Sequence, residues 1–372
     1  MGADDVHVAP DTAEELLVEA AVADLLGLER ISTTANFFES GGNSLIAMRL
    51  IARLHRDTGR DLRVKDIFAR QTIGEIARLL EEDSREVPPS EAITVPLRPG
   101  TSGRTLFCIH EYNGFATIYS QLLDGVPSEW AVVGMQDPVH GGSLVVADGF
   151  DALCDVYVDA VLARQPDGPY DILGWSYGGH LALGVVRRLV DRGHDVATLT
   201  ILDAVPTVDG RLLDGSLRDD DEIMPEGVSA YDMVHDTDVQ DEFMARFARR
   251  EEGIGNMSPG EIDTLSPTQK RTWATAGMRA EFMQRQPTRG RFDGPMLLVT
   301  ASAGKPVGHS GRVAEMWREF VPELVVVDVD STHSGMLDDA RPRREWLPAL
   351  SRHLVTDRAM VTTTATSQEE GR

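Results

Sequence analysis

The pattern of apolar positions changes near residue 93, and this change divides the chain into two segments. In residues 1–82, apolar side chains recur at helical spacing and no run has the character of a strand. Capping-box spacing at Thr12 and at Thr72, each with a glutamate three residues later, marks two helix starts. Apolar positions across residues 45–58 mark a third helix. We therefore expect a small all-α bundle of a size that folds alone.

Beyond residue 93, short apolar runs rich in β-branched residues alternate with helical stretches. The predicted strands occupy residues 105–109, 130–136, 169–173, 196–202, 295–300 and 324–329. Helical periodicity marks residues 151–164 and 181–190 between them. This alternation is typical of the α/β class, in which helices cover both faces of a mostly parallel sheet.

A polar insertion at residues 207–290 interrupts this alternation and is rich in Asp, Glu, Arg and Met. It contains helical stretches such as residues 241–250, and its place between strands favours a lid over an active site. The alternative is a surface excursion without function. Outside the two folded segments, we expect a linker at residues 83–92 and a disordered tail at residues 355–372.

Composition and charge exclude several classes of partner. The 372 residues carry a formal net charge of −24, which argues against nucleic acid and against a polybasic membrane anchor. No apolar run approaches transmembrane length and the N-terminus lacks a signal-peptide core, so we expect a cytoplasmic protein. Cys108 and Cys154 fall in a predicted strand and a predicted helix, so neither a disulfide nor a metal site is expected.

The run Gly174-Trp175-Ser176-Tyr177-Gly178 has the pattern G-x-S-x-G and lies between a predicted strand and a predicted helix. A serine on a tight strand-to-helix turn adopts a strained backbone, so the flanking positions must be small. The turn exposes the hydroxyl at the end of the sheet and places the next N–H at a helix start, where an anion is stabilised. Although a purely structural turn is the alternative, this context favours Ser176 as a catalytic nucleophile.

A serine nucleophile needs a base and an acid that orients the base. Asp203 directly follows the predicted strand at residues 196–202, and His333 follows the one at residues 324–329. Catalytic groups gather at the carboxyl ends of parallel strands, and the order Ser…Asp…His is that of an α/β-hydrolase. Asp203 could merely cap a turn, but the rival strand at residues 295–300 leads into a segment without a carboxylate. We predict Asp203 as the acid and His333 as the base.

Three other histidines compete with His333 for the role of base. His309 lies in a Gly/Ser-rich segment, His194 follows a predicted helix, and His180 lies on the helix after the nucleophile. Each has a structural explanation: a surface position, a charge that complements a helix end, or packing against neighbours. Only His333 has the expected place in the strand order.

The oxyanion hole of such an enzyme combines the N–H after the nucleophile with a second N–H from an earlier loop. The first is the backbone N–H of Tyr177. The second comes from the loop after the strand at residues 105–109, where we assign the backbone of Tyr112. An ordinary strand-to-helix turn that ends at Gly114 is the alternative for this loop.

In the helical segment, Gly41 and Gly42 free the backbone just before a predicted helix, and Ser44 stands at its start. Ser44 can serve as a simple N-cap. A serine at a helix N-terminus is also well placed to hold a phosphate, because the helix dipole and the free N–H groups favour anions.

This stretch resembles the carrier domain of nonribosomal peptide synthetases, whose hallmark is F-F-x-x-G-G-x-S-L followed by a helix. The matching residues are Phe37, Phe38, Gly41, Gly42, Ser44 and Leu45. The resemblance implies a four-helix carrier domain over residues 10–82. It also implies that Ser44 bears 4′-phosphopantetheine through a phosphodiester, which a phosphopantetheinyl transferase attaches.

Residues 93–354 resemble the type I thioesterase that ends such synthetases, an α/β-hydrolase with a helical lid. The resemblance is carried by Gly174 to Gly179, by Ile201-Leu202-Asp203, and by Thr332-His333 with Met336-Leu337. It implies the same Ser176, Asp203 and His333 triad. At residues 110–114 the chain departs from the family, which often has a proline after a His or Phe.

Together the two resemblances imply the carrier–thioesterase end of a synthetase for antibiotic biosynthesis. Its substrate would be a peptidyl thioester on the arm of Ser44, delivered by upstream synthetase domains and transferred to Ser176. Hydrolysis would release an acid and macrocyclisation a ring. A serine esterase that acts on free esters, with the helical segment as a docking module, is the alternative, and a non-catalytic scaffold is a third.

Overall fold

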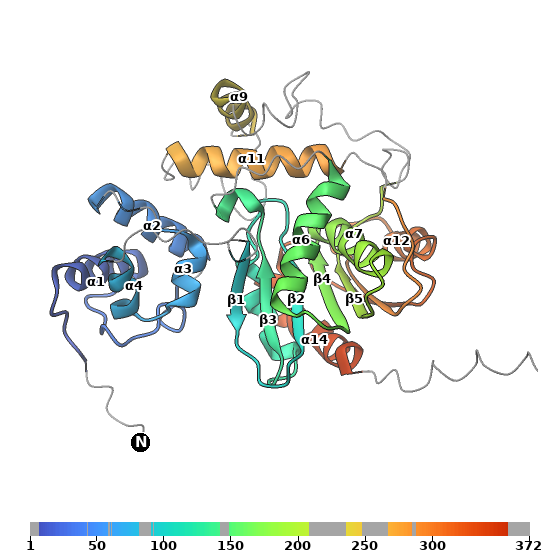
Figure 1. Ribbon diagram of the computed structural model, residues 1–372, viewed down its shortest axis with the longest axis horizontal. Helices are drawn as coiled ribbons and strands as arrows, with labels where there is room; N and C mark the ends of the chain where they lie inside the picture. The colour runs from blue at the N-terminus through green and yellow to red at the C-terminus, as the bar shows by residue number, and fades with distance from the viewer. Residues whose placement is uncertain are drawn as a thin grey trace, which may run out of the picture.

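A helical unit and a larger α/β unit make up the protein (Figure 1). The structure is a computed structural model. It describes residues 7–42, 44–58, 60, 62–81, 91, 93–141, 149–207, 236–247, 267–284 and 288–355. Most of the expected linker and the tail beyond residue 355 lie outside these ranges, as do residues 208–235 and 248–266 of the expected lid.

The N-terminal unit is all-α, as its sequence predicts. Its helices are α1 (Ala13–Leu26), α2 (Ser44–Thr58), α3 (Val64–Ala69) and α4 (Ile73–Glu81). The Thr12 hydroxyl accepts the Glu15 N–H at 3.1 Å and begins α1. At α4 the capping bonds are reciprocal, because the Thr72 N–H donates to the Glu75 carboxylate at 3.2 Å and the Glu75 N–H to the Thr72 hydroxyl at 3.4 Å. Both helix starts are therefore confirmed.

The second unit is built on one seven-stranded sheet with the order β1-β3-β2-β4-β5-β6-β7. Its strands are β1 (Thr94–Arg98), β2 (Thr105–Ile109), β3 (Ala131–Met135), β4 (Tyr170–Trp175), β5 (Val196–Leu202), β6 (Met296–Ala301) and β7 (Leu324–Val329). Among these described strands, the β1–β3 pair is antiparallel and the other five pairs are parallel. The mostly parallel sheet is confirmed.

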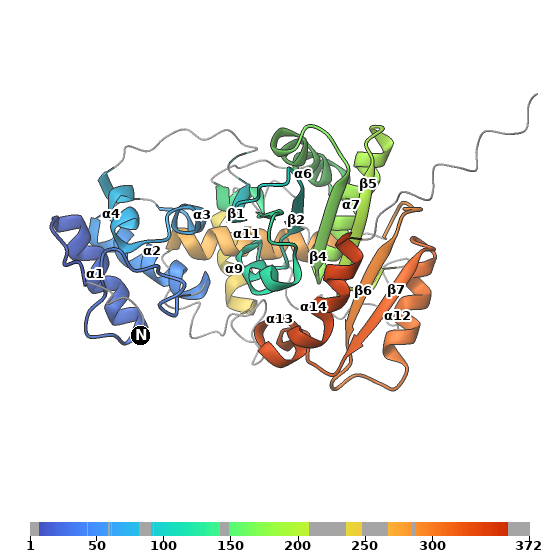
Figure 2. The same cartoon turned by 90° about the horizontal axis from the view of Figure 1, so that it is seen from below.

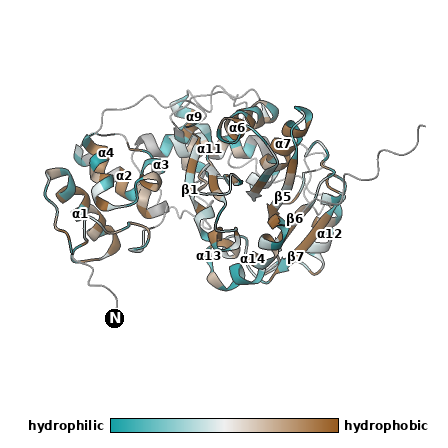
Figure 3. Ribbon diagram, turned by 60° about the horizontal axis from the view of Figure 1, so that its bottom comes forward, coloured by the Kyte–Doolittle hydropathy of each residue, from teal (hydrophilic) through white to brown (hydrophobic). Residues whose placement is uncertain are grey.

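Alternating side chains divide the sheet into two apolar faces. In β2, Leu106 and Cys108 join one buried cluster, whereas Phe107 and Ile109 join the other. The first face is covered by η1 (Thr117–Gly125) and α14 (Ala340–Val355), and the second by α6 (Phe150–Arg164), α7 (Tyr177–Asp191) and α12 (His309–Arg318). Figure 2 shows α14 and α6 on opposite sides of the strands, and in Figure 3 both helices mix hydrophilic teal with hydrophobic brown.

The register of the strands brings their carboxyl ends together. Ile109 pairs with Gly174, and Trp175 pairs with Leu202. Leu202 in turn pairs with Val299. Because these partners are in parallel strands, the residues that follow β2, β4, β5 and β6 leave the sheet along one edge.

The described parts of the insertion include α9 (Thr237–Phe247) and α11 (Pro267–Gln284). α11 crosses the end of the sheet, and α9 lies on its outer side (Figure 1). Although its sequence reads as polar, α11 buries Trp273, Ala274, Met278 and Ala280, each at most 1% exposed. Within the described residues, no helix combines the length and apolarity that a membrane span needs.

Candidate active site

The turn at Ser176 has the strained conformation that the G-x-S-x-G pattern predicts. Ser176 has φ 56° and ψ −126°, and α7 begins at the next residue, earlier than the helical periodicity suggested. A Cβ on Gly174 would lie 2.0 Å from the Gly178 carbonyl oxygen, and one on Gly178 would lie 2.4 Å from the His110 carbonyl oxygen. The glycines are therefore needed because backbone packs directly against them.

This turn presents two groups at the edge of the sheet. The Ser176 side chain is half-buried, and its backbone N–H donates to the Leu202 carbonyl at 2.9 Å. The N–H of Tyr177 belongs to the first turn of α7, where N–H groups have no acceptor within the helix. It is therefore available to an oxyanion that forms at Ser176.

Asp203 and His333 come together across 130 residues of chain. The His333 Nδ1 donates to the Asp203 Oδ2 at 2.7 Å. Asp203 itself has φ 41°, and its Oδ1 accepts the Ala301 N–H at 3.0 Å. The positive φ turns the carboxylate back toward the end of β6, and so toward the loop that carries His333.

The imidazole of His333 also lies beside the nucleophile turn. It stacks on the indole of Trp175, with ring centroids 5.0 Å apart, and Trp175 directly precedes Ser176. Ser176 and His333 are both described residues, and the Ser176 hydroxyl does not form a hydrogen bond with His333. In the unliganded state of such enzymes this bond is often long, and it tightens when substrate binds.

Two neighbouring side chains stabilise the negative charge of Asp203. Burial alone would raise the pKa of Asp203, but the hydrogen bond and charge of His333, together with Lys305, lower this pKa to about 2. Lys305 Nζ donates to both carboxylate oxygens, at 3.1 Å to Oδ1 and 2.9 Å to Oδ2. This contact of Lys305 was not predicted from the sequence, where residues 301–305 stood out only for lacking a carboxylate.

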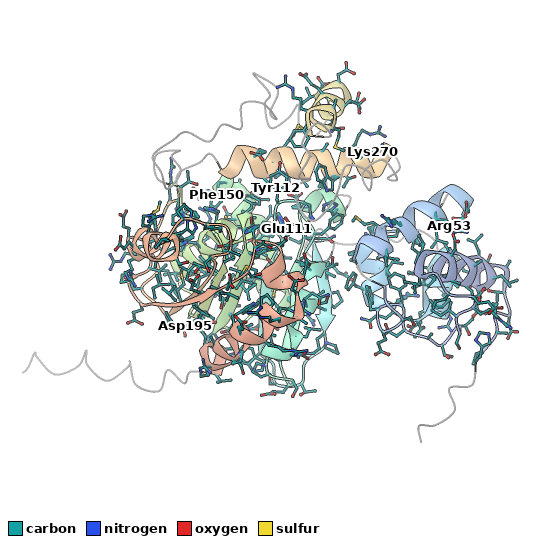
Figure 4. The ribbon with its side chains drawn as sticks, turned by 180° about the vertical axis from the view of Figure 1, so that it is seen from behind. Arg53, Glu111, Tyr112, Phe150, Asp195 and Lys270 are labelled. Atoms are coloured by element: carbon teal, nitrogen blue, oxygen red, sulfur yellow. The ribbon has the colours of Figure 1, made fainter. Side chains whose placement is uncertain are left out.

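The loop after β2 lies against the nucleophile turn. Its His110 carbonyl contacts Gly178, and the His110 ring lies 5.9 Å from that of Tyr177. This places residues 110–114, including Tyr112, next to the start of α7. Figure 4 labels Glu111 and Tyr112 beneath α11.

A buried carboxyl group competes for the second oxyanion donor. Glu111 is 3% exposed, and its carboxyl accepts hydrogen bonds from the backbone N–H groups of Asn113, at 3.2 Å, and of Tyr112. Burial raises the pKa of Glu111 to about 8, although these hydrogen bonds oppose the rise. The Tyr112 N–H thus has an intramolecular partner, and Glu111 must release it before it can serve an oxyanion.

The helix α11 packs over the loop that follows β2. A Cβ on Gly277 would lie 3.3 Å from the Tyr112 ring, which is a close packing contact. Arg279 donates to Asp137 at 2.8 Å, and both side chains are at most 7% exposed. Burial raises the pKa of Asp137, but Arg279 and His110 outweigh it and hold this pKa below its usual value. A buried ion pair therefore ties α11 to the loop after β3.

The rival histidines have other surroundings. His180 lies near Thr288, with 3.3 Å between its Nδ1 and the Thr288 hydroxyl. His194 packs edge-on against Tyr170 at the opposite end of β4. His309 begins α12 rather than lying in a surface loop, and burial and Lys305 lower its pKa.

In the helical unit, the backbone before Ser44 is shaped for a helix start. Gly41 has φ 106°, and a Cβ on Gly42 would lie 2.5 Å from the Phe37 ring. The helix α2 begins at Ser44 and has no acidic residue in its first turn. This end of α2 therefore fits a phosphodiester, because helix N–H groups face it and no nearby carboxylate of the helix repels it.

Comparisons with known proteins agree with both units. A family model described as "Thioesterase domain" matches residues 104–336, and one described as "Phosphopantetheine attachment site" matches residues 17–80. A crystal structure of a four-domain nonribosomal peptide synthetase, bound to AMP and glycine, aligns with a TM-score of 0.55 and 21% identity. The alignment covers 95% of this chain and 26% of that one, and it shows a likeness of fold.

Curated relatives come from the same class of enzyme. Enterobactin synthase component F of Escherichia coli (strain K12) is 38% identical over 200 residues, which are 53% of this chain and 15% of that protein. Vanchrobactin synthetase VabF of Vibrio anguillarum is 26% identical over 318 residues, which are 85% of this chain and 10% of that protein. The chain thus spans a small part of their length. It belongs to the thioesterase domain family and joins this domain to a phosphopantetheine attachment domain, as in nonribosomal peptide synthetases.

Proposed function

We propose that this chain releases an acyl group, of the peptidyl class, from its own carrier domain through a covalent intermediate on Ser176. The observation that carries this proposal is the His333–Asp203 hydrogen bond of 2.7 Å beside a strained serine turn, in a chain that also has a carrier domain. Ser176, Asp203 and His333 act as nucleophile, orienting acid and base.

In the first half-reaction, His333 accepts the hydroxyl proton of Ser176 as the Ser176 oxygen attacks the thioester carbonyl carbon. Because Nδ1 of His333 faces Asp203, the Nε2 atom is the one that takes the proton. Asp203 stabilises the imidazolium that forms. The carbon–sulfur bond then breaks, His333 returns the proton to the leaving sulfur, and the acyl group remains on Ser176.

In the second half-reaction, His333 removes a proton from an attacking nucleophile, and the ester bond to Ser176 breaks as the serine regains its proton. Water as nucleophile gives a free acid, and an amine or hydroxyl of the acyl chain gives a ring. The expected lid, residues 207–290, would govern this choice by admitting or excluding water. We propose the Tyr177 N–H as one oxyanion donor, and the Tyr112 N–H, once Glu111 releases it, as the second. Each such donor contributes about 3 kcal/mol in comparable sites.

Ser44 is the proposed attachment point of phosphopantetheine, which supplies a thiol that carries an acyl group as a thioester. The first turn of α2 would hold its phosphate through backbone N–H groups. For this unit we propose residues 10–82 as the carrier, residues 83–92 as the linker and residues 93–354 as the thioesterase. Upstream synthetase domains and a phosphopantetheinyl transferase are the proposed partners.

The nucleophile is tested with an acyl thioester of N-acetylcysteamine and with a fluorophosphonate. We expect Ser176→Ala to lose both turnover and labelling, and His333→Ala to lose turnover, because neither step can begin without them. His194→Ala is the matched control, since this histidine lies at the other end of β4. Full turnover by Ser176→Ala would refute the assignment.

The carrier is tested separately by incubation with coenzyme A and a phosphopantetheinyl transferase. We expect one phosphopantetheinyl mass increment per chain, which Ser44→Ala abolishes and Ser40→Ala retains. If no increment forms, the helical unit is a docking module and the chain acts on free esters.

A further inference from the structure

The carboxylate of Asp203 has a second partner that the proposed reaction does not use. Lys305 extends from the loop after β6, and its Nζ bridges both carboxylate oxygens at 3.1 and 2.9 Å. The Oδ2 atom that accepts from Lys305 is the same atom that accepts from His333. The Asp203 side chain is 3% exposed, whereas that of Lys305 is 26% exposed, so Lys305 reaches a buried carboxylate from a partly exposed position.

This contact fills the acceptor capacity of the carboxylate. Oδ1 receives the Ala301 N–H and Lys305, and Oδ2 receives His333 and Lys305. A carboxylate has about four lone-pair sites. With all of them engaged, Asp203 is fixed in rotation and cannot turn away from His333.

Lysine is rare in this chain. Lys65, Lys270 and Lys305 are the only lysines in the sequence, against 36 residues of Lys plus Arg. The buried or half-buried aspartates Asp171, Asp155 and Asp137 pair with arginine instead. A compact ammonium can bridge both oxygens of Asp203 while His333 keeps its hydrogen bond to Oδ2. A planar guanidinium binds a carboxylate through two parallel hydrogen bonds and would compete with His333 for Oδ2.

Other charged side chains of the described residues lie near this ion pair. His309, at the start of α12, lies within the electrostatic influence of Lys305, Asp203, Arg312 and Asp328. The Asp328 carboxylate is bound by the hydroxyls of Thr300, at 2.9 Å, and Ser310, at 2.7 Å. Asp203 is therefore the carboxylate that Lys305 directly bonds.

We propose that Lys305 is a positioning residue of the triad, which holds the Asp203 carboxylate toward His333 and offsets part of its negative charge. The inference rests on the proposed function of Ser176, Asp203 and His333. Its consequence is twofold. The ammonium fixes the geometry of the acid, and it weakens the electrostatic stabilisation that Asp203 gives to a protonated His333.

These two effects can be separated by the readout. Lys305→Met frees the carboxylate, so we expect kcat to fall about tenfold, as for other partners that orient a catalytic group, while KM changes little. It also removes a positive charge near the imidazolium, so the acidic limb of the kcat/KM profile should move to higher pH, by roughly half a unit at this partly exposed site. Loss of a merely structural ion pair would change neither kcat nor the acidic limb of the kcat/KM profile.

Chemical rescue gives the sharper test. Cys108 and Cys154 are fully buried, and burial raises the pKa of both thiols, so Lys305→Cys introduces the one accessible thiol of the described residues. Alkylation with 2-bromoethylamine restores an ammonium at nearly the lysine length, whereas iodoacetamide adds a neutral amide of similar size. We expect only the first reagent to restore kcat and the pH profile.

The controls keep the two proposals distinguishable. Lys270→Met, on α11, tests the loss of a lysine elsewhere, and thermal melting confirms that each variant is folded. If Ser176→Ala retains turnover, the proposed function fails irrespective of Lys305. If Ser176→Ala is inactive but Lys305→Met keeps wild-type kcat and the same acidic limb, the role of Lys305 is overturned. Equal rescue by both alkylating reagents would overturn it as well.

Discussion

The buried carboxyl group of Glu111 makes the stability of this fold depend on pH. Burial raises the pKa of Glu111 to about 8 in the folded protein, from an ordinary value of 4.5 for an exposed glutamate. Between these values the folded state holds a proton that the unfolded state has lost. Stability therefore falls as pH rises through this window, by roughly 1 kcal/mol per pH unit, and levels off above the folded pKa.

Glu111→Gln should remove this dependence. The amide has nearly the shape of the protonated acid, and its oxygen can still accept the Asn113 and Tyr112 N–H groups. We expect the variant to match the wild-type melting temperature near pH 4.5 and to exceed it increasingly up to pH 8. Thermal melts across this range measure the difference, which isolates Glu111 from the buried histidines. Parallel curves would show that Glu111 is ionised in the folded state.

The nucleophile turn leaves no room for a methyl group at position 178. Gly178→Ala would place a Cβ 2.4 Å from the His110 carbonyl oxygen and 2.5 Å from that of Ile109. Since both neighbours are backbone atoms, the loop after β2 or the turn must shift. We expect a loss of about 2 kcal/mol or more in unfolding free energy, together with loss of fluorophosphonate labelling.

Gly311→Ala is the matched control for this change. Gly311 lies in α12 and a Cβ there meets nothing within 4 Å, so stability should be kept or raised by up to about 1 kcal/mol. Chemical denaturation with labelling of both variants makes the comparison. If Gly178→Ala reacts with fluorophosphonate and unfolds like the wild type, the backbone does not pack as closely against Gly178 as the structure shows.

Some residues of the site can be predicted from the sequence and others cannot. Ser176, Asp203 and His333 follow strands that the hydrophobic runs predict, and the structure shows a hydrogen bond between Asp203 and His333. Lys305 and Glu111 escaped the sequence analysis, because their roles depend on contacts across the edge of the sheet. No local period encodes a bond between residues 102 positions apart.

At the scale of elements, α11 shows how a polar sequence can conceal a core helix. Its stretch was expected only as part of a polar insertion, yet Thr275, Arg279 and Glu281 are each at most 5% exposed. Their burial depends on partners in other segments, such as Asp137 after β3. Hydropathy alone underestimates such a helix, because it scores the side chain without its partner.

The buried Arg279–Asp137 pair should make α11 a fixed roof rather than a freely moving lid. Arg279→Met would leave Asp137 charged and uncompensated, so we expect a loss of about 3 kcal/mol or more in unfolding free energy. Combining it with Asp137→Asn should cost less than the sum of the single changes by more than 1 kcal/mol. Arg271→Met on the same helix is the control. Additive losses in denaturant titrations would show that the two side chains are not coupled.

At the scale of the whole molecule, the two units stand side by side, and α3 contacts β1. Lys65 on α3 donates to the Glu91 carbonyl at 3.0 Å, which adds a bond just before the sheet begins. The proposed linker is short, and a short tether holds its two ends at an effective concentration of about millimolar. Under the proposed function, delivery of the acyl group is therefore an intramolecular event.

Complementation between two full-length variants measures what the tether contributes. A Ser176→Ala chain loaded on Ser44 can only donate, and a Ser44→Ala chain can only receive and release. Mixed at 10 µM each, they should release product about a hundredfold more slowly than the loaded wild type, because about millimolar is a hundred times this concentration. The rate should rise linearly with receiver concentration, and neither variant alone should release product. Release in the mixture at the wild-type rate would mean that docking between the units, rather than the covalent link, brings the acyl group to Ser176.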